Sequence, residues 1–299
     1  MSRHRDLFVL LFFLLALFLF FYLISGLLTP HADFQDLSLG GGEKVALVEI
    51  VGPIYNPQPI LEQLNKIEEN SSVKAVLLRL ETPGGGVAAS QEVYRKLAHL
   101  RDEKKMPIVA SMGGVAASGG YYVALGADTI MANPGTLTGS IGVILEVPTY
   151  GRLLDKIGID YEVVKSGKFK DAPSPVRPLT PEERSYIQSV IDDSYEQFLN
   201  VVAVERHLDL KQAELLADGR VYTGQQAQKL GLVDLLGGRD DALKLAGQLG
   251  GISGVPRLVE FRKKKLTLFN LLFDDLMDLV FLRLGLACPL RYELPATLR

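Results

Sequence analysis

Two glycine-rich turns hold the residues of this chain whose types and spacing are best suited to chemistry. The first, Thr82–Gly86 (Thr-Pro-Gly-Gly-Gly), follows the apolar run Leu77–Leu80 and precedes a helical pattern. Because glycines let backbone N–H groups approach a ligand closely at the start of a helix, this turn could bind an anion or a developing oxyanion. Glycines alone are equally compatible with a plain turn. No Gly-Lys-Ser/Thr follows the turn, so it does not match a P-loop. The third glycine of the dinucleotide-binding fingerprint is also missing.

The second turn, Gly113–Tyr122, surrounds Ser118 with small residues. These neighbours leave space for another chain to approach the hydroxyl group, and the helix expected to follow directs its positive end toward it. Ser118 is therefore a candidate nucleophile. Taken alone, however, the pattern is more typical of a helix N-cap, for which serine is strongly preferred.

The base that would activate Ser118 must come from a histidine, a lysine or an acid. No histidine lies in a turn expected to face Ser118, and the histidines also lack the close spacing of a metal site. They are His4, His31, His99 and His207. Lysine is the other candidate base.

Residues Ser166–Asp171 follow an expected strand and contain two lysines, Lys168 and Lys170. A lysine has an ordinary pKa of about 10.4, so at pH 7 it is almost wholly protonated and cannot act as a base. Lowering that pKa by about three units through burial costs about 4 kcal/mol, which a substrate-covered cleft can offset. In an extended strand the two lysines share a face, so periodicity does not separate them. Taken alone, either lysine is more typical of a solvated side chain.

The elements that must position these residues alternate between short β-branched runs and longer amphipathic stretches, which predicts an α/β fold with parallel strands and right-handed crossovers. The expected strands are Lys44–Val51, Val73–Glu81, Pro107–Met112, Asp128–Ala132, Ile141–Val147 and Tyr161–Lys165. The expected helices are Pro59–Glu69, Val87–Lys104, Ser118–Leu125, Thr149–Ile157, Pro181 to about His207, Lys211–Leu216 and Arg239–Leu249. Thr180 and Glu183 form a capping-box pattern at the start of the long helix.

The N-terminal run Leu7–Leu28 has 22 residues and no charged side chain. As a helix it would reach roughly 33 Å, enough to cross a hydrocarbon core of about 30 Å. A cleaved secretory signal is the alternative, but its apolar region is usually about 7–15 residues long, and Thr29–Ala32 is a poor cleavage site. Because Arg3 and Arg5 precede the run and basic flanks stay cytoplasmic, we expect everything after residue 30 on the outer side of a bacterial membrane.

The chain is thus expected to divide into five segments. These are a cytoplasmic N-terminus (residues 1–6), a transmembrane helix (7–28), a linker (29–43), a main domain (44–260) and a C-terminal amphipathic tail (261–299). The tail begins with the basic run Arg262–Lys265, and its later polar residues have helical spacing. It could pack on the main domain or on a neighbouring subunit, or lie along the membrane surface.

The composition of the 299 residues limits the class of protein. Hydrophobic residues make up 47%, enough for a sizeable core. The net charge of −3, from 32 basic and 35 acidic residues, provides no field to hold a polyanion, so nucleic acid is not expected as a partner. The single cysteine, Cys288, excludes an internal disulfide and a Cys-rich zinc cluster. We expect neither a metal nor a cofactor.

Five motifs, taken in order, resemble those of the short, membrane-anchored form of bacterial signal peptide peptidase A, a family of serine proteases with a Ser-Lys dyad. They are Thr82–Gly85, Ala117–Tyr122, Gly139–Val143, Ser166–Asp171 and Gly219–Gly224. The resemblance covers about residues 44–260, which would be the protease domain. It implies the spiral of β-β-α units shared by the Clp protease and crotonase groups. The segment Ala227–Asp234 is shared with crotonase-like folds and supports the architecture more than the activity.

The resemblance also implies roles for individual residues. Ser118 corresponds to the family's nucleophile and Lys170 to its general base. Lys168 is set aside because the family's Lys-Asp pair falls on Lys170 and Asp171. Ser140 corresponds to the residue that hydrogen-bonds the neutral lysine and orients it.

Gly85 and Gly119 correspond to the oxyanion donors through their backbone N–H groups. The implied reaction is acyl transfer through an acyl-enzyme, with signal peptides left in the membrane after secretion as substrates. An apolar groove for an extended chain is therefore expected. The resemblance further implies a ring-shaped homo-oligomer whose dyad is built across neighbouring subunits, so that activity would require assembly.

Two alternatives come from other classes of protein. A crotonase-type acyl-CoA enzyme would use a similar fold and a glycine oxyanion hole, but it needs cytosolic CoA and typically acidic catalytic groups. A non-catalytic membrane scaffold of the same fold would keep the glycines for packing, but it would not need both Ser118 and Lys170.

Overall fold

The structure is a computed structural model of the chain, and it describes residues 42–261 and 291–293 together with the helical positions 13, 15, 17, 18 and 20. The chain divides into two compact units. One comprises residues 1–35 and 262–283, and the other residues 36–261 and 284–299. The second unit contains all the strands from β1 to β10 and the helices from α2 to α9.

The expected transmembrane helix, residues 7–28, and the expected tail, residues 261–299, fall mostly outside the described residues. In the part of the chain that the structure describes, no helix combines the length and the apolar character that a bilayer crossing requires. The membrane anchor and the role of the tail therefore stay predictions.

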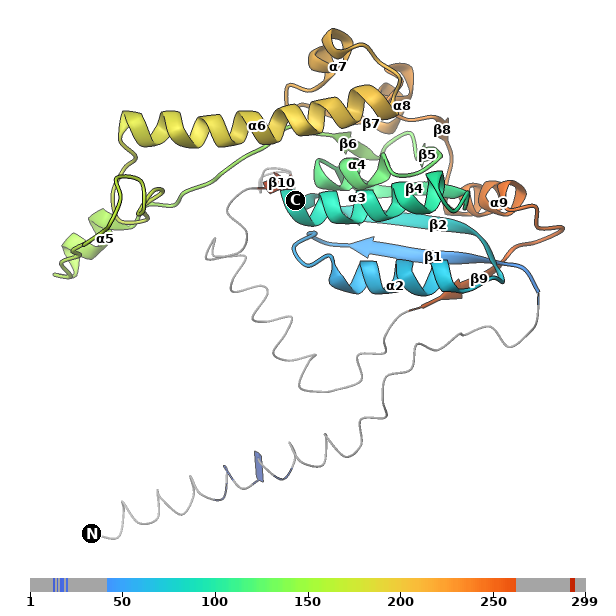
Figure 1. The fold of residues 1–299 in the computed structure, drawn as a ribbon, viewed down its shortest axis with the longest axis horizontal. Coiled ribbons are helices and arrows are strands. Elements are labelled where there is room, and N and C mark those ends of the chain that lie inside the picture. Colours follow the sequence, from blue (N-terminus) through green and yellow to red (C-terminus); the bar gives the residue numbers. More distant parts are fainter. Residues whose placement is uncertain are drawn as a thin grey trace. The chain divides into compact units, whose positions relative to one another are not determined.

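An eight-stranded, mostly parallel sheet forms the centre of the second unit (Figure 1). Its main path has the order β7 (Val221–Thr223), β6 (Leu137–Gly139), β4 (Ile108–Ala117), β2 (Val73–Thr82), β1 (Lys44–Val51) and β9 (Arg257–Glu260). Off this path, β5 (Thr129–Ala132) pairs with β4 and with β8 (Leu235–Leu236). Every pair in this sheet is parallel except β6 with β7. The predicted α/β class is confirmed.

The central strands are apolar on both faces because both faces are covered, as is usual for parallel sheets. Alternate residues such as Leu47 and Leu77 pack in one cluster with Ala242 and Ala246 of helix α9 (Arg239–Leu249). Their neighbours along the strands, such as Val48, are also buried. Strands β1, β2 and β4 thereby form a rigid base for the turns that follow them.

The other helices begin and end close to the expected positions. They are α2 (Gln58–Glu69), α3 (Val87–Asp102), α4 (Gly119–Ala124), α5 (Gly151–Lys156), α6 (Pro181–Glu205) and α7 (Leu210–Leu216). Helix α8 (Gly224–Lys229) was not expected from the sequence. The capping box of α6 is confirmed, because Thr180 Oγ1 accepts from the Glu183 N–H at 3.2 Å and the Glu183 carboxylate accepts from the Thr180 N–H at 2.9 Å.

Two of the expected strands are wrong. Ile141–Val147 is irregular, and the strand in this region is β6, which ends at Gly139. Tyr161–Lys165 forms no strand, and all five of its residues are exposed. The β-branched pattern identified residues that suit a strand, but a strand also requires a partner for its backbone groups.

Strands β7, β8 and β9 were not expected from the sequence, nor were two further short strands. Strand β3 (Gly84–Gly86) forms within the first glycine-rich turn, and β10 (Arg291–Glu293) pairs with it antiparallel, with Tyr292 opposite Gly85. This pairing joins segments about 200 residues apart, which is beyond the reach of local sequence patterns.

Residues 145–180, which we call the arm, carry α5 and the turns before α6. Figure 1 shows the arm extending from the N-terminal end of α6, away from the sheet. Many of its large apolar side chains are exposed, including Leu153, Ile157, Tyr161 and Val164, the last with 93% of its surface accessible. Exposed large apolar side chains gathered in one segment are often found where another molecule binds.

Candidate active site

Ser118 lies at the sharp turn between strand β4 and helix α4. Its φ and ψ angles are 55° and −116°, in a region that a residue with a side chain rarely adopts. Nucleophilic serines are found on strained strand-to-helix turns of this kind. Ser118 occupies the N-cap position, but its side chain makes no capping hydrogen bond. The alternative of a simple helix cap is therefore not supported by the structure.

The parallel pair β4 and β6 brings Ser118 and Ser140 side by side. Ala117 and Gly139 pair in register at the ends of these strands. The N–H of Ser118 donates a 2.7 Å hydrogen bond to the Gly139 carbonyl oxygen, and the N–H of Ser140 donates a 2.8 Å bond to the Arg220 carbonyl oxygen. Both serines are at least nine-tenths buried and both have positive φ angles. The predicted nucleophile and the predicted lysine-orienting serine are thus neighbours.

The two glycines predicted as oxyanion donors lie on segments that pack together. A Cβ on Gly85 would lie 2.3 Å from the carbonyl oxygen of Ile54, so a side chain does not fit there. Gly119 directly follows the predicted nucleophile, and a Cβ on the next residue, Gly120, would lie 2.6 Å from Thr82 Cγ2. Close packing of Gly85 against Ile54 and of Gly120 against the end of β2 therefore requires glycine. Because α4 contacts both β2 and β3, the two predicted donors lie around the same turn.

Lys170 lies apart from this group. It is exposed on a turn of the arm, before α6 begins at Pro181. Further along α6, Phe198 contacts Tyr122 of α4, with ring centroids 4.9 Å apart. At about 1.5 Å per residue, the helix from Pro181 to Phe198 is about 26 Å long. Within the described single chain, Ser118 and Lys170 are therefore not brought together.

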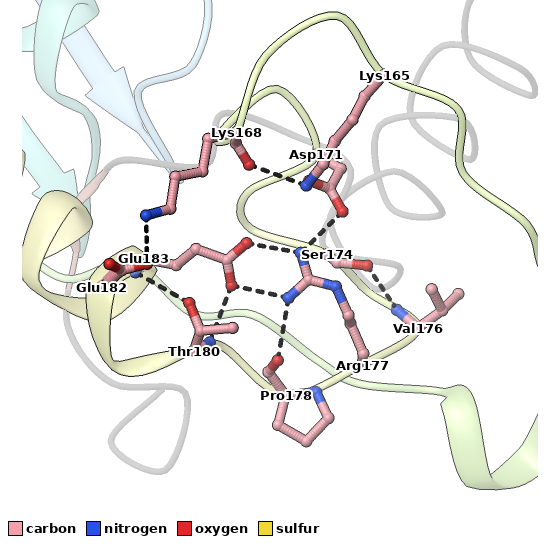
Figure 2. Close-up of polar contacts among 10 residues, drawn as sticks. All are labelled: Lys165, Lys168, Asp171, Ser174, Val176, Arg177, Pro178, Thr180, Glu182 and Glu183. Atoms are coloured by element: carbon pink, nitrogen blue, oxygen red, sulfur yellow. Dashed lines mark hydrogen bonds and ion pairs between the residues drawn. The ribbon is translucent and has the colours of Figure 1, made fainter.

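The residue after Lys170, Asp171, belongs to an ion-pair network between the arm and α6 (Figure 2). Its carboxylate accepts hydrogen bonds from Lys165 Nζ and, at 2.8 Å, from Arg177 Nη2. Arg177 also donates two bonds to the carboxylate of Glu183, at 2.7 and 2.6 Å. The bonds from Lys165 and Arg177 lower the pKa of Asp171 to about 2, and the bonds from Arg177 lower that of Glu183 to about 2.

Lys168, the second candidate lysine, is paired with an acid. Its Nζ lies 2.6 Å from Glu182 Oε2 and 5.6 Å from the centroid of the Phe169 ring. Lys168 and Lys170 lie on a turn, so the expectation that they share one face of a strand is wrong. A pocket of about 350 Å³ at this place is lined by Lys165, Lys168, Phe169, Arg177, Pro178, Thr180, Glu182 and Glu183. Its paired charges do not resemble the apolar groove expected for the substrate.

Sequence reasoning missed two residues that hold the site segments in place. Arg177 fastens the turn that carries Lys170, and Glu81 binds the backbone of the strand that leads to Ser118. The sequence does contain a signal for Glu81, because it is a charged residue at the end of an apolar strand, directly before the glycine-rich turn. Among the residues that the structure describes, no group of three or more His, Cys, Asp or Glu side chains could hold a metal ion.

A strained serine next to a glycine-lined backbone, at the ends of parallel strands, is the arrangement expected of a serine hydrolase. Comparison with known proteins specifies the class. The family model described as "Peptidase family S49" matches residues 100–253, a range that contains Ser118, Ser140 and Lys170.

Three relatives illustrate the similarity. A putative protease of Synechocystis is 47% identical over 212 residues, which cover 70% of this chain and 76% of the relative. A putative protease of Methanocaldococcus jannaschii is 38% identical, over 83% of this chain and 86% of the relative. A putative signal peptide peptidase SppA of Enterococcus faecium is 44% identical, over 63% of this chain and 55% of the relative. The chain belongs to peptidase family S49 and is a serine peptidase.

Proposed function

We propose that this chain is a membrane-anchored endopeptidase that cleaves remnant signal peptides, with Ser118 as nucleophile and Lys170 as general base. The observation that carries the proposal is the strained and uncapped Ser118, held next to Ser140 by the β4–β6 pair. The family supports the reaction, and the relative named as a signal peptide peptidase supports the substrate class. The family also favours a peptidase over the acyl-CoA enzyme and the scaffold. The proposed architecture is the Clp protease and crotonase-like spiral of β-β-α units.

In the proposed mechanism, the neutral Lys170 amine takes the hydroxyl proton as Ser118 Oγ bonds to the peptide carbonyl carbon. The N–H groups of Gly85 and Gly119 stabilise the negative charge on the carbonyl oxygen. The C–N bond then breaks, and Lys170 returns its proton to the leaving amine. Water, deprotonated by the same amine, attacks the ester, and release of the acid restores the Ser118 hydroxyl.

The dyad is proposed to form between neighbouring subunits of a ring-shaped homo-oligomer. Ser118 is buried at the start of α4, which contacts the C-terminal half of α6 through Phe198, whereas Lys170 is exposed before the N-terminal end of α6. The exposed apolar side chains of the arm favour docking of the arm on another copy of the chain. Burial at that contact would disfavour the charged form of the Lys170 amine, as the mechanism requires.

Strand β3 is the proposed docking edge for the substrate. Its residues, Gly84–Gly86, already pair antiparallel with an extended segment of the same chain, Arg291–Glu293. Main-chain pairing of this kind binds extended peptides with little dependence on their side chains. A signal peptide could therefore add to the same edge and present a carbonyl group to Ser118.

The proposed location of the protease domain is the outer side of the bacterial cell membrane, with a cytoplasmic N-terminus. This follows from the uncharged run Leu7–Leu28 and the preceding Arg3 and Arg5. A protease that acts on signal peptides needs access to the membrane, which an N-terminal anchor provides.

The test is cleavage of a fluorogenic signal-peptide-like substrate by the purified full-length chain. Ser118→Ala and Lys170→Ala should each abolish turnover, whereas Lys168→Ala, which removes the neighbouring lysine, should leave it intact. Turnover that survives loss of both dyad residues excludes this mechanism.

A mixing experiment tests whether the dyad crosses the subunit boundary. Inactive Ser118→Ala and Lys170→Ala chains should regain activity when they are co-assembled, because some contacts then join an intact serine to an intact lysine. Activity that stays absent in mixed oligomers of confirmed composition would show that each chain supplies both residues of its own dyad.

A further inference from the structure

Strand β4 is irregular immediately before the proposed nucleophile. Its pairing with β2 joins Leu80 to Met112 and then Thr82 to Ala116, so β4 uses more residues than β2 over this interval. Residues 113–115 therefore have no pairing partner in β2, and backbone groups that face β2 must find other partners. Because the bulge lies only a few residues before Ser118, its geometry helps to set where that serine stands.

Glu81 accepts hydrogen bonds from two of the N–H groups of the bulge. Its Oε2 accepts a 2.9 Å hydrogen bond from the Gly114 N–H, and its Oε1 accepts a 3.1 Å bond from the Val115 N–H. A Cβ on Gly113 would lie only 1.7 Å from Oε2, so this glycine makes room for the carboxylate. Arg79 Nη2 lies 3.9 Å away from the same oxygen. The Glu81 carboxylate thus occupies the space beside Gly113 and binds the backbone of the bulge.

Hydroxyl groups hold the carbonyl groups of the same segment from the opposite side. Thr136 Oγ1 donates a 2.6 Å bond to the Gly113 carbonyl oxygen, and Thr138 Oγ1 donates a 2.7 Å bond to that of Ala116. Both threonines are buried. Side chains from two neighbouring segments therefore hold two N–H groups and two carbonyl groups within residues 113–116.

Glu81 also stands at the start of the other half of the site. Thr82 follows Glu81, and Gly85, a proposed oxyanion donor, lies four residues after Glu81. On the other segment, Ser118 lies three residues after Val115. The carboxylate therefore fastens the segment that carries one oxyanion donor to the segment that carries the nucleophile and the second donor, Gly119.

We infer that Glu81 is a positioning residue that sets the spacing between the two halves of the oxyanion hole. The inference rests on the proposed serine peptidase mechanism. In the proposed mechanism Glu81 contacts neither the substrate nor the reacting atoms. Loss of its carboxylate should weaken binding of the tetrahedral species, in which the oxygen is charged, more than binding of the uncleaved peptide.

The test compares Glu81→Gln with the wild type and with Glu69→Gln, a control at an exposed acid of α2. We expect Glu81→Gln to lower kcat about tenfold with KM changed less than about twofold, and Glu69→Gln to match the wild type. A peptide aldehyde, which forms a tetrahedral adduct with the serine, should bind Glu81→Gln about tenfold more weakly. The corresponding peptide alcohol, which forms no adduct, should bind unchanged.

Two results would overturn the inference. One is a Glu81→Gln variant with kcat within about twofold of the wild type. The other is an equal loss of affinity for the aldehyde and the alcohol, which indicates general loosening of the site. If Glu81→Gln does not fold, the same kinetic and inhibitor measurements are made on Glu81→Asp, which keeps the carboxylate charge but has a side chain one methylene shorter.

A Ser118→Ala chain in the same assay separates this inference from the proposed function. Cleavage by Ser118→Ala, or none by the wild type, defeats the proposed mechanism and the role of Glu81 together. If the wild type is active, Ser118→Ala is inactive and Glu81→Gln is unaffected, only the role of Glu81 is excluded.

Discussion

Arg177 Nη2 donates a 2.8 Å hydrogen bond to Asp171 Oδ2, and Asp171 is the residue that follows Lys170. The same guanidinium binds the carboxylate of Glu183 with two hydrogen bonds in the first turn of α6 (Figure 2). Planar, paired hydrogen bonds of this kind impose geometry as well as attraction. The turn that carries the proposed base is therefore fastened to the start of a long helix.

Substitution of Arg177 should impair catalysis without preventing folding. In Arg177→Met the turn loses its attachment to Glu183, so Lys170 should spend less time in the productive position and kcat should fall at least about tenfold. Steady-state kinetics on a signal-peptide-like substrate measure this effect. Arg184→Met, at an exposed arginine in the first turns of α6, should behave as the wild type. An equally active Arg177→Met variant would mean that the network does not position Lys170.

The same network predicts a defined pH dependence of stability. The pKa values of Asp171 and Glu183 lie at about 2, below the ordinary 3.8 and 4.5, because hydrogen bonds from Lys165 and Arg177 stabilise the Asp171 carboxylate and those from Arg177 stabilise the Glu183 carboxylate. Since these pKa values are lowered on folding, the stabilisation is complete above pH 4.5 and is lost as the pH falls toward 2.

Denaturant unfolding of the wild type and Arg177→Met across this range provides the measurement. The difference in unfolding midpoint between the two chains should be constant from about pH 5 to 8 and shrink below about pH 4.5. A difference that grows on acidification would contradict the assignment, because it would require carboxylates whose pKa rises on folding.

A side chain at Gly85 should disable the site. In Gly85→Ala the new Cβ would meet the Ile54 carbonyl oxygen at 2.3 Å, so β3 must shift and its N–H must leave the oxyanion position. Loss of one oxyanion donor typically costs about 100-fold to 1000-fold in kcat. Gly135→Ala is the matched control, because a Cβ there meets nothing within 4 Å and its φ is not positive. A Gly85→Ala chain with kcat near that of the wild type would remove Gly85 from the proposed oxyanion hole.

Removal of β10 should expose the proposed docking edge. Residues 291–293 pair with Gly84–Gly86, so a peptide substrate must displace them before it can pair there. A chain that ends at residue 290 should therefore show a lower KM for peptide substrates, with kcat little changed. Steady-state kinetics of the shortened and full-length chains give the comparison. A KM that is unchanged or higher would place substrate binding elsewhere or give β10 a supporting role.

The extent of successful prediction differs between local and non-local features. The capping box of Thr180 and Glu183 and the bounds of α6 could be predicted because they depend on residues within one or two turns. The strand expected at Tyr161–Lys165 is absent because β-branched residues favour a strand only where a partner strand is available. Pairing of β10 with β3 could not be expected, because nothing local links residues so far apart.

The candidate site shows the same division. The sequence by itself determined the residue types that chemistry requires, namely Ser118 among small residues, the glycines before and after it, and lysines in a later turn. Only the tertiary structure decided that Ser140 stands next to Ser118, that Glu81 binds the bulge of β4, and that Lys170 lies beyond the far end of α6. The reason is physical. Local patterns depend on the backbone preferences of neighbouring residues, whereas the distances between catalytic groups depend on strand register and packing between distant segments.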